Sequence, residues 1–268
     1  MKLTILGSGG AIPIPRPFCQ CEICTKARKF GAPYKRNSSS LFIQDINTLI
    51  DCGEDIGNSL NKNSVENIDN LFITHWHPDH TFGLRSVLES NFNFKTNKAD
   101  RTTNVYIPKK VFETLKKKFP VIEYYFDVQK TGILHLVEDE DKIEIGNFFI
   151  TVVGYKGKES ETYAFLIEKD NKKVLYASCD TIGFDNYKNY KNLDLLINEC
   201  GLFSDISSEI SFNDLMNRIN EIKPKKTILT HIEELEVNKW GEKHFDKMKE
   251  EYSNINFEFA YDGMEIQV

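Results

Sequence analysis

Short apolar runs separated by polar turns recur along the chain and predict a fold in which strands alternate with helices. Six runs have the length and composition of buried strands: residues 41–43, 49–50, 71–74, 148–153, 162–167 and 194–197. The first two flank a short polar segment and are expected to pair as a hairpin. The pattern by itself predicts an α/β protein and leaves the order of the strands open.

Helical spacing of apolar residues predicts the helices between these strands. The expected helices cover residues 55–61, a segment starting at residue 81, residues 108–119 and residues 211–219. The clearest apolar stripe consists of Val111, Phe112, Leu115 and Phe119. Because these positions recur every three or four residues, the lysines between them are expected to form a solvated face rather than a phosphate site.

The densest chemical signal is the hexapeptide His75-Trp76-His77-Pro78-Asp79-His80, directly after the apolar run at residues 71–74. The chain has six histidines, and three of them fall within this stretch. It lies at the carboxyl end of a strand, where α/β folds place their sites. His75 and His77 can converge on one ion from an extended loop, and Asp79 and His80 can hold a second. Imidazoles and carboxylates are common ligands of zinc, iron and manganese, so the hexapeptide predicts a divalent-metal site.

The hexapeptide matches H-x-H-x-D-H, the signature of hydrolases with the metallo-β-lactamase fold, and the rest of the chain is similar to that family. A strand and a glycine-rich turn occupy residues 3–10, and later strands lead into Asp51, Asp180 and His231. These matches run from residue 3 to about residue 267. The resemblance implies a single domain, residues 1–268, folded as an αββα sandwich of two mixed β-sheets flanked by helices.

The resemblance also implies the ligands of two neighbouring ions. These are His75 and His77 for the first ion, Asp79, His80 and His231 for the second, and Asp180 as a bridge between them. Asp51 is expected either to orient an imidazole from behind or to be a turn residue at its strand end. Such a pair of ions would activate a hydroxide and clamp a phosphodiester or polarise a carbonyl, with Asp79 and Asp180 as catalytic groups.

One ligand of the family pattern is missing. The third histidine of the first ion belongs between the strands at residues 148–153 and 162–167, and residues 154–161 contain no histidine. Lys156 or Tyr155 is expected to occupy its place. A protonated lysine has only donors and cannot bind a metal, so Lys156 is predicted instead to hold a substrate phosphate as part of the catalytic site.

A carboxylate could replace the missing imidazole, and the candidates are Glu159 and Glu161. His135 lies well before this connection and is expected at the surface. Because the first ion lacks one ligand, we expect its site to bind metal more weakly than the site that contains His80.

A second metal signal is the Cys-x-Cys-x-x-Cys spacing of Cys19, Cys21 and Cys24. Three thiolates can bind one zinc ion, whereas a disulfide would leave one sulfur over; the alternative is three reduced cysteines on a loop. The spacing resembles phosphonate-pathway cyclic phosphodiesterases of this superfamily, in which a late histidine completes a structural zinc site. That resemblance places Glu234 at the fourth position, with His244 as a further candidate. The other cysteines, Cys52, Cys179 and Cys200, are expected to be buried small hydrophobes.

The composition of the chain limits the kinds of partner that the protein is expected to bind. The net charge of −6 does not favour general nucleic-acid binding, and an RNA-processing role is not expected. No apolar run approaches the ~18 residues of a membrane span. The first residues turn polar too soon for a signal peptide, and free or zinc-bound thiols are typical of a cytoplasmic protein. The oligomeric state is left open, with a homodimer as one option.

Together these observations predict a metal-dependent hydrolase, with one or two zinc, manganese or iron ions in its active site. The predicted activity is that of a phosphodiesterase acting on a small or cyclic phosphodiester through a metal-bound hydroxide. Two alternatives stay open. The first alternative is also a hydrolase, but one that cleaves a lactone, a thioester or a β-lactam, since one fold hosts many chemistries. The second alternative is not an enzyme: it is a binding protein that has lost its metal and its catalytic activity.

Overall fold

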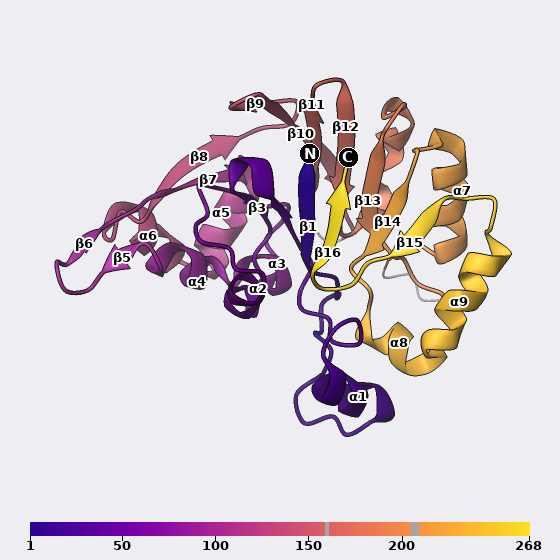
Figure 1. Ribbon diagram of the computed structural model, residues 1–268. Coiled ribbons are helices and arrows are strands. Elements are labelled where there is room, and N and C mark those ends of the chain that lie inside the picture. Colours follow the sequence, from indigo (N-terminus) through magenta and orange to yellow (C-terminus); the bar gives the residue numbers. More distant parts are fainter. Residues whose placement is uncertain (159–160, 205–208) are drawn as a thin grey trace.

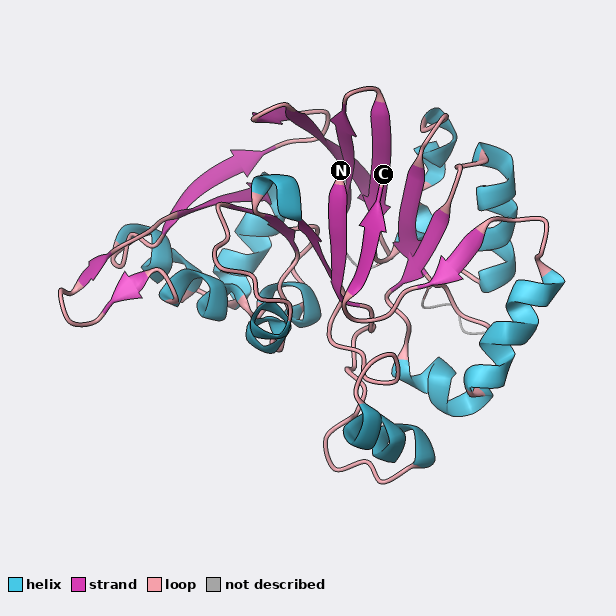
Figure 2. Cartoon of the chain, in the orientation of Figure 1, coloured by secondary structure: helices cyan, strands magenta, loops and turns pink. Residues whose placement is uncertain are grey.

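A computed structural model describes residues 1–158, 161–204 and 209–268 of the chain. Two seven-stranded sheets face each other at the centre, and helices lie on both outer flanks (Figure 1). The cartoon coloured by secondary structure shows the same layers, with the strands between two groups of helices (Figure 2). This arrangement confirms the αββα sandwich of two mixed sheets.

The first sheet contains strands from the first half of the chain together with the last strand, and the second sheet contains the strands between them. The first sheet contains, in spatial order, β16 (Met264–Gln267), β1 (Lys2–Gly7), β2 (Ser40–Ile43), β3 (Thr48–Ile50), β4 (Asn70–Phe72), β7 (Thr103–Pro108) and β8 (Gly132–Val137). The second contains β15 (Phe257–Phe259), β14 (Thr227–Thr230), β13 (Leu195–Glu199), β12 (Lys172–Ala177), β11 (Glu161–Lys169), β10 (Phe148–Lys156) and β9 (Lys142–Ile145). A small hairpin of β5 (Phe92–Asn93) and β6 (Lys98–Ala99) projects from the side (Figure 1).

Each sheet is antiparallel in one half and parallel in the other. Strands β16, β1, β2 and β3 pair antiparallel, and β3, β4, β7 and β8 pair parallel. In the second sheet β9 to β12 are antiparallel and β12 to β15 are parallel. Parallel strands bring their carboxyl ends to one edge of a sheet, which is the edge where ligands bind in open α/β folds.

The helices cover the outer faces of the sandwich. The first sheet carries α2 (Ile56–Lys62), α3 (Pro78–Thr81), α4 (Leu84–Glu89), α5 (Lys109–Lys118) and α6 (Ile122–Asp127). The second sheet carries α7 (Phe212–Ile222), α8 (Glu234–Trp240) and α9 (Glu242–Glu251). The helix α1 (Glu22–Phe30) projects below the sandwich near α8 (Figure 1). Short 3₁₀ turns are η1 (Gln44–Ile46), η2 (Thr181–Gly183) and η3 (Asp185–Asn189).

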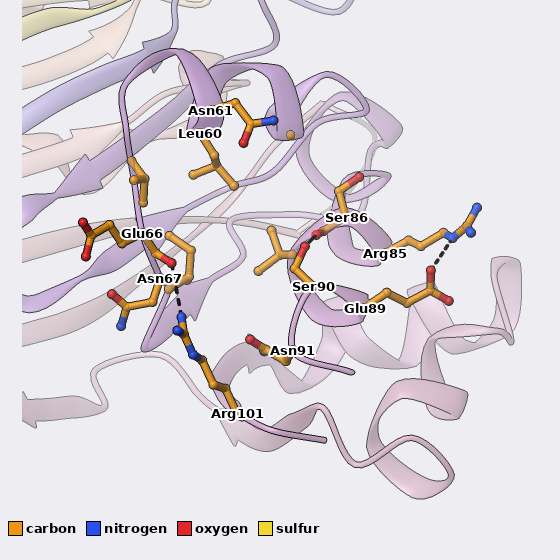
Figure 3. A pocket seen from close by; sticks show the side chains of 14 residues that line it. Leu60, Asn61, Glu66, Asn67, Arg85, Ser86, Glu89, Ser90, Asn91 and Arg101 are labelled. Carbon is orange, nitrogen blue, oxygen red and sulfur yellow. Dashed lines mark hydrogen bonds and ion pairs between the residues drawn. The ribbon is translucent and has the colours of Figure 1, made fainter. Parts of the chain in front are cut away.

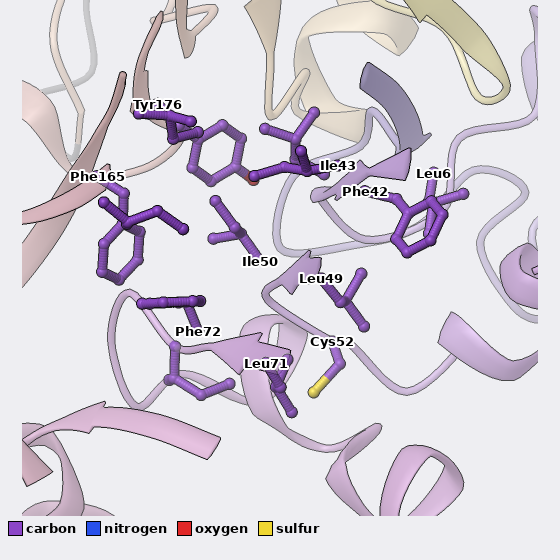
Figure 4. Packing of buried hydrophobic residues seen from close by; sticks show 14 of the residues in the cluster. Leu6, Phe42, Ile43, Leu49, Ile50, Cys52, Leu71, Phe72, Phe165 and Tyr176 are labelled. Atoms are coloured by element: carbon purple, nitrogen blue, oxygen red, sulfur yellow. The ribbon is translucent and has the colours of Figure 1, made fainter. Parts of the chain in front are cut away.

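Apolar side chains fill both the space between the sheets and the layer under α7. Along β12, Val174 and Tyr176 belong to the core between the sheets, whereas Leu175 and Ala177 pack on the other side. Figure 4 shows Tyr176 and Phe165 of the second sheet near the apolar residues of the first. Burial on both faces explains why this strand has a continuous apolar run instead of an alternating one.

Most expected elements form where the pattern placed them, with two differences. Residues 81–88 form parts of two short helices, α3 and α4, which are separated at Phe82 and Gly83. Strands β10 and β11 extend further toward each other than expected, and their register pairs Lys156 with Glu161. Gly157 and Lys158 are the described residues of the connection between these two strands, where the missing histidine was expected. Among the described residues, no helix has both the length and the apolar character needed to cross a bilayer.

Candidate metal centre

Four loops that follow strands carry the candidate metal ligands. Strand β3 leads into Asp51, β4 into His75, β12 into Asp180 and β14 into His231. A hydrogen bond of 3.5 Å from Ser178 Oγ to Asp51 Oδ2 joins the loops of the two sheets. Asp180 and His231 have positive φ angles of 55° and 52°, which residues with a side chain rarely adopt. Such strained turns cluster at functional sites.

Asp79, His80 and His231 form one group of converging donor atoms, all within 4.8 Å of one another. Nε2 of His80 lies 3.1 Å from Oδ2 of Asp79, and Nε2 of His231 lies 3.4 Å from the same oxygen. The two Nε2 atoms are 3.4 Å apart. All three side chains are buried, so the structure brings together two sequence-distant parts of the chain around one small polar space.

His75 and His77 form the neighbouring pair. Nε2 of His75 lies 3.0 Å from Nδ1 of His77, and Nδ1 of His75 lies 3.0 Å from Oγ1 of Thr74. His75 is fully buried and His77 is half-buried at the mouth of the cluster. The ring centroids of His75 and His80 are 4.2 Å apart, so the two groups of the hexapeptide are adjacent.

Asp51 lies behind His80. Its Oδ2 atom is 2.8 Å from Nδ1 of His80, and its carboxylate accepts hydrogen bonds from the backbone and hydroxyl of Thr74 at 2.8 to 3.0 Å. Both Asp51 and His80 are fully buried. A carboxylate behind an imidazole holds the proton on Nδ1 and leaves Nε2 free to bind a metal.

The histidines differ in their electrostatic surroundings. Burial lowers the pKa of His80, but the carboxylates of Asp79 and Asp51 outweigh it and raise that pKa to about 9. Burial also opposes the charge of His231, whose pKa is raised to about 9 by Asp79 and Glu233. Burial, followed by the positive neighbours His80 and His77, lowers the pKa of His75 well below its usual value. The carboxylates around His80 and His231 therefore favour a positive charge at these positions.

Asp180 is held by the turn between β10 and β11. The backbone N–H of Lys158 donates to both of its carboxylate oxygens at 2.8 Å. Gly157 makes this approach possible, because a Cβ atom there would lie 2.0 Å from Oδ2 of Asp180. Among the described residues, Asp180 does not join either group of donors around His80, so the bridging role implied by the family resemblance stays a prediction.

Neither residue expected at the place of the missing histidine lies among the converging donors. Tyr155 is buried, stacks on Phe184 and donates its hydroxyl to the carbonyl of Cys179 at 2.6 Å. Lys156 is exposed and lines a pocket whose described lining residues include none of the clustered histidines. Glu161 pairs with Lys110 at 3.0 Å, and Glu159 lies outside the described residues.

The three amino-terminal cysteines come together. The sulfurs of Cys19, Cys21 and Cys24 lie within 4.8 Å of one another, and none forms a disulfide. Cys21 is the residue before α1 and accepts a hydrogen bond from the backbone of Cys24 at 3.4 Å. Its sulfur also donates to Oδ1 of Asn238 at 3.0 Å. Burial raises the pKa of Cys24 to about 11, so an ion must displace a firmly held proton there.

The two candidates for the fourth ligand lie differently. Glu234 is the first residue of α8, is buried and accepts a hydrogen bond from the side-chain amide of Asn238. Since Asn238 also accepts a hydrogen bond from Cys21, its side chain connects Glu234 to the cysteines. His244 stacks on Trp240 and meets Phe203 edge to face. His244 is therefore part of an aromatic cluster, and of the two only Glu234 is connected to the cysteines.

Two groups of residues near the cluster had no signal in the sequence pattern. Glu209 and Glu233 place carboxylate oxygens within 4.8 Å of His231, and Oε1 of Glu233 is 3.4 Å from Nδ1 of that histidine. Cys179 places its sulfur within 4.8 Å of donor atoms of His75 and His80. The expectation that Cys179 is only a buried hydrophobe was incomplete: it is buried, but beside imidazoles.

A separate pocket of about 600 Å³ lies between α2, α4 and the loop before β4 (Figure 3). Its lining is mixed and includes two polar contacts: Arg101 donates to the carbonyl of Glu66 at 3.2 Å, and Arg85 pairs with Glu89 at 2.8 Å. Its described lining residues include none of the clustered histidines. The volume of this pocket is therefore no indication of where the metal ligands lie.

A sandwich of two mixed sheets with histidines and aspartates at its strand ends defines the metallo-β-lactamase class of fold. The donors are imidazole and carboxylate groups, which suit a divalent cation. Residues 46–232 match the beta-lactamase superfamily domain. The chain belongs to that superfamily.

Individual relatives agree with this assignment at moderate similarity. Ribonuclease Z of Picrophilus torridus is 28% identical over 232 residues, which cover 85% of this chain and 65% of that protein. The chain thus spans somewhat less than two thirds of this relative. A diphosphatase of the PhnP family has a TM-score of 0.79 at 21% identity, covering 100% of this chain and 97% of that one. Zinc-bound PqqB of Methylobacterium extorquens has a TM-score of 0.81 at 15% identity, and the two chains cover each other completely.

Proposed function

We propose that this protein is a metal-dependent hydrolase that cleaves a small or cyclic phosphodiester. The observation that carries the proposal is the convergence of Asp79, His80 and His231 within 4.8 Å at the ends of strands from both sheets. Two of the similar proteins, named as a ribonuclease and a diphosphatase, support hydrolysis of a phosphorus–oxygen bond. The net charge of −6 favours a small phosphodiester over RNA.

The position of each residue indicates its role in the proposed reaction. Asp79, His80 and His231 would hold a divalent cation, which supplies Lewis-acid stabilisation of a phosphoryl oxygen and activation of water. Asp51 would hold the proton of His80 on Nδ1, so that Nε2 could bind the cation. His75 and His77 would bind a second ion beside the first. Lys156 keeps its predicted role in holding substrate phosphate, although its side chain lines a separate pocket.

The test is turnover of a bis-aryl phosphodiester with added zinc or manganese, compared between the wild type and two variants. We expect His80→Ala to lose most bound metal and at least a hundredfold in activity, because one of three converging donors is removed. His135→Ala is the matched control, since His135 lies on β8, stacked on Tyr106. Equal activity in wild type and His80→Ala would refute the site.

Other substrates decide between the remaining functions. Hydrolysis of a lactone or thioester, with no phosphodiester turnover, would replace the proposed bond. Cleavage of a precursor tRNA with no turnover of small esters would replace the substrate class. Metal binding without any turnover would indicate a binding scaffold. The Lys156→Ala variant tests the role of Lys156 in substrate binding. A higher KM at unchanged metal content supports that role, and an unchanged KM contradicts it.

A further inference from the structure

We propose that Cys179 supplies a thiolate ligand to the His75 side of the centre, in place of the third imidazole of the family pattern. The proposal rests on the proposed metal-dependent function and adds a ligand to the same site. Donor atoms of His75, His80 and Cys179 lie within 4.8 Å of one another, and all three residues are buried. This group shares His80 with the group of Asp79 and His231, so the two lie side by side.

Strand β10, which leads into the connection that lacks the histidine, supports the backbone of Cys179. Tyr155, at the end of β10, donates its hydroxyl to the carbonyl of Cys179 at 2.6 Å. Stacking on Phe184, at a centroid distance of 4.6 Å, fixes the tyrosine ring. Tyr155 therefore stands near the place of the missing ligand and holds the backbone of the residue that replaces it.

The same turn leaves no room for an imidazole at Gly157. A Cβ atom there would lie 2.0 Å from Oδ2 of Asp180 and 2.7 Å from Oγ1 of Thr162. Asp180 is also bound by the backbone N–H of Lys158. Gly157 and Lys158 thus fix Asp180, and the short side chain of Cys179 reaches the histidines from the opposite loop.

The distances suit a tetrahedral ion. Two nitrogens bound to one zinc at ~2.0 Å lie roughly 3.3 Å apart, and a nitrogen and a sulfur roughly 3.6 Å. The 3.0 Å between Nε2 of His75 and Nδ1 of His77 is close to the first value. The sulfur of Cys179 lies within 4.8 Å of donor atoms of His75 and His80. A thiolate favours zinc, cobalt or cadmium over manganese, so the His75 side should select softer ions.

Cobalt(II) titration of the full-length protein tests this ligand, because thiolate-to-cobalt charge transfer gives a near-ultraviolet band that imidazole and carboxylate do not. We expect Cys179→Ser to lose about a quarter of this band when the amino-terminal cysteines are also loaded, and all of it when they are empty. We also expect one equivalent of cobalt to bind at least tenfold more weakly. Cys200→Ser is the control, since Cys200 is equally buried in the apolar layer under α7.

A band of equal intensity and an unchanged cobalt affinity in Cys179→Ser overturn the proposal. If Cys179→Ser does not fold, an anomalous-scattering map of the zinc-loaded wild type decides instead. An ion about 2.3 Å from Sγ of Cys179 supports the ligand, and an ion bound only by nitrogen and oxygen overturns it. Absence of any ion at the histidines of the wild type would refute the proposed function itself, so the two failures are distinguishable.

Discussion

Replacing Asp51 with asparagine tests whether this carboxylate sets the position of the proton on His80. Asp51 is fully buried. Its Oδ1 accepts from the backbone and hydroxyl of Thr74 at 2.8 and 3.0 Å, and its Oδ2 lies 2.8 Å from Nδ1 of His80. Asparagine has nearly the same shape, so the substitution replaces an acceptor by a donor without opening a cavity.

Only one orientation of the new amide preserves the Thr74 backbone bond, and it turns the NH₂ group toward Nδ1 of His80. Two donors cannot bond, so the His80 proton must move to Nε2, the atom that faces Asp79 and His231. A protonated nitrogen cannot bind a metal. We therefore expect Asp51→Asn to weaken zinc binding about 10- to 100-fold, or about 1.4 to 2.8 kcal/mol.

Competition with a chromophoric chelator measures this affinity, and a thermal melt of the metal-free protein checks that the variant is folded. Asp69→Asn is the matched control, because Asp69 is exposed and its carboxylate accepts hydrogen bonds from the side-chain amides of Asn47 and Asn67. A folded Asp51→Asn variant that binds zinc within twofold of the wild type would show that the carboxylate does not control the His80 proton.

Three further predictions concern stability. Replacing Cys19 and Cys21 with serine should remove one zinc per chain and lower the melting temperature, as measured by metal analysis and calorimetry; unchanged zinc would contradict this. The hydrogen bond from Lys225 is the largest cause of the low pKa of Asp194, about 2. Because the pKa of Asp194 is lower in the folded than in the unfolded protein, its contribution to the free energy of unfolding is present above about pH 4 and is lost toward pH 2. Asp194→Asn should therefore lower the free energy of unfolding by about 1 kcal/mol at pH 7, a value reduced because the partner lysine is exposed, and should have no effect near pH 2. Urea titrations at the two pH values measure this difference. Leu215→Ala, in the buried face of α7, should cost about 2 to 5 kcal/mol, against less than about 0.5 for the exposed Asn220→Ala.

Local pattern was sufficient for the elements whose neighbours in sequence are also their neighbours in space. The hairpin of β2 and β3 and the helix α5 form where the spacing placed them. The hexapeptide likewise brings His75, His77 and His80 together by itself, because they follow one strand within six residues. The resemblance to a known family added the two-sheet fold, which periodicity alone does not specify.

The sequence alone determined that the chain carries a histidine–aspartate cluster and three clustered thiols within this fold. The family resemblance already named His231 as a partner of Asp79 and His80, whereas the tertiary structure added Cys179 beside His75 and His80. His231 reaches Asp79 because β14 and β4 lie in facing sheets, and the hydroxyl of Tyr155 on β10 holds the backbone of Cys179 near His75. Side-chain direction at the end of a strand depends on such non-local contacts, and hydrophobic periodicity carries no information about them.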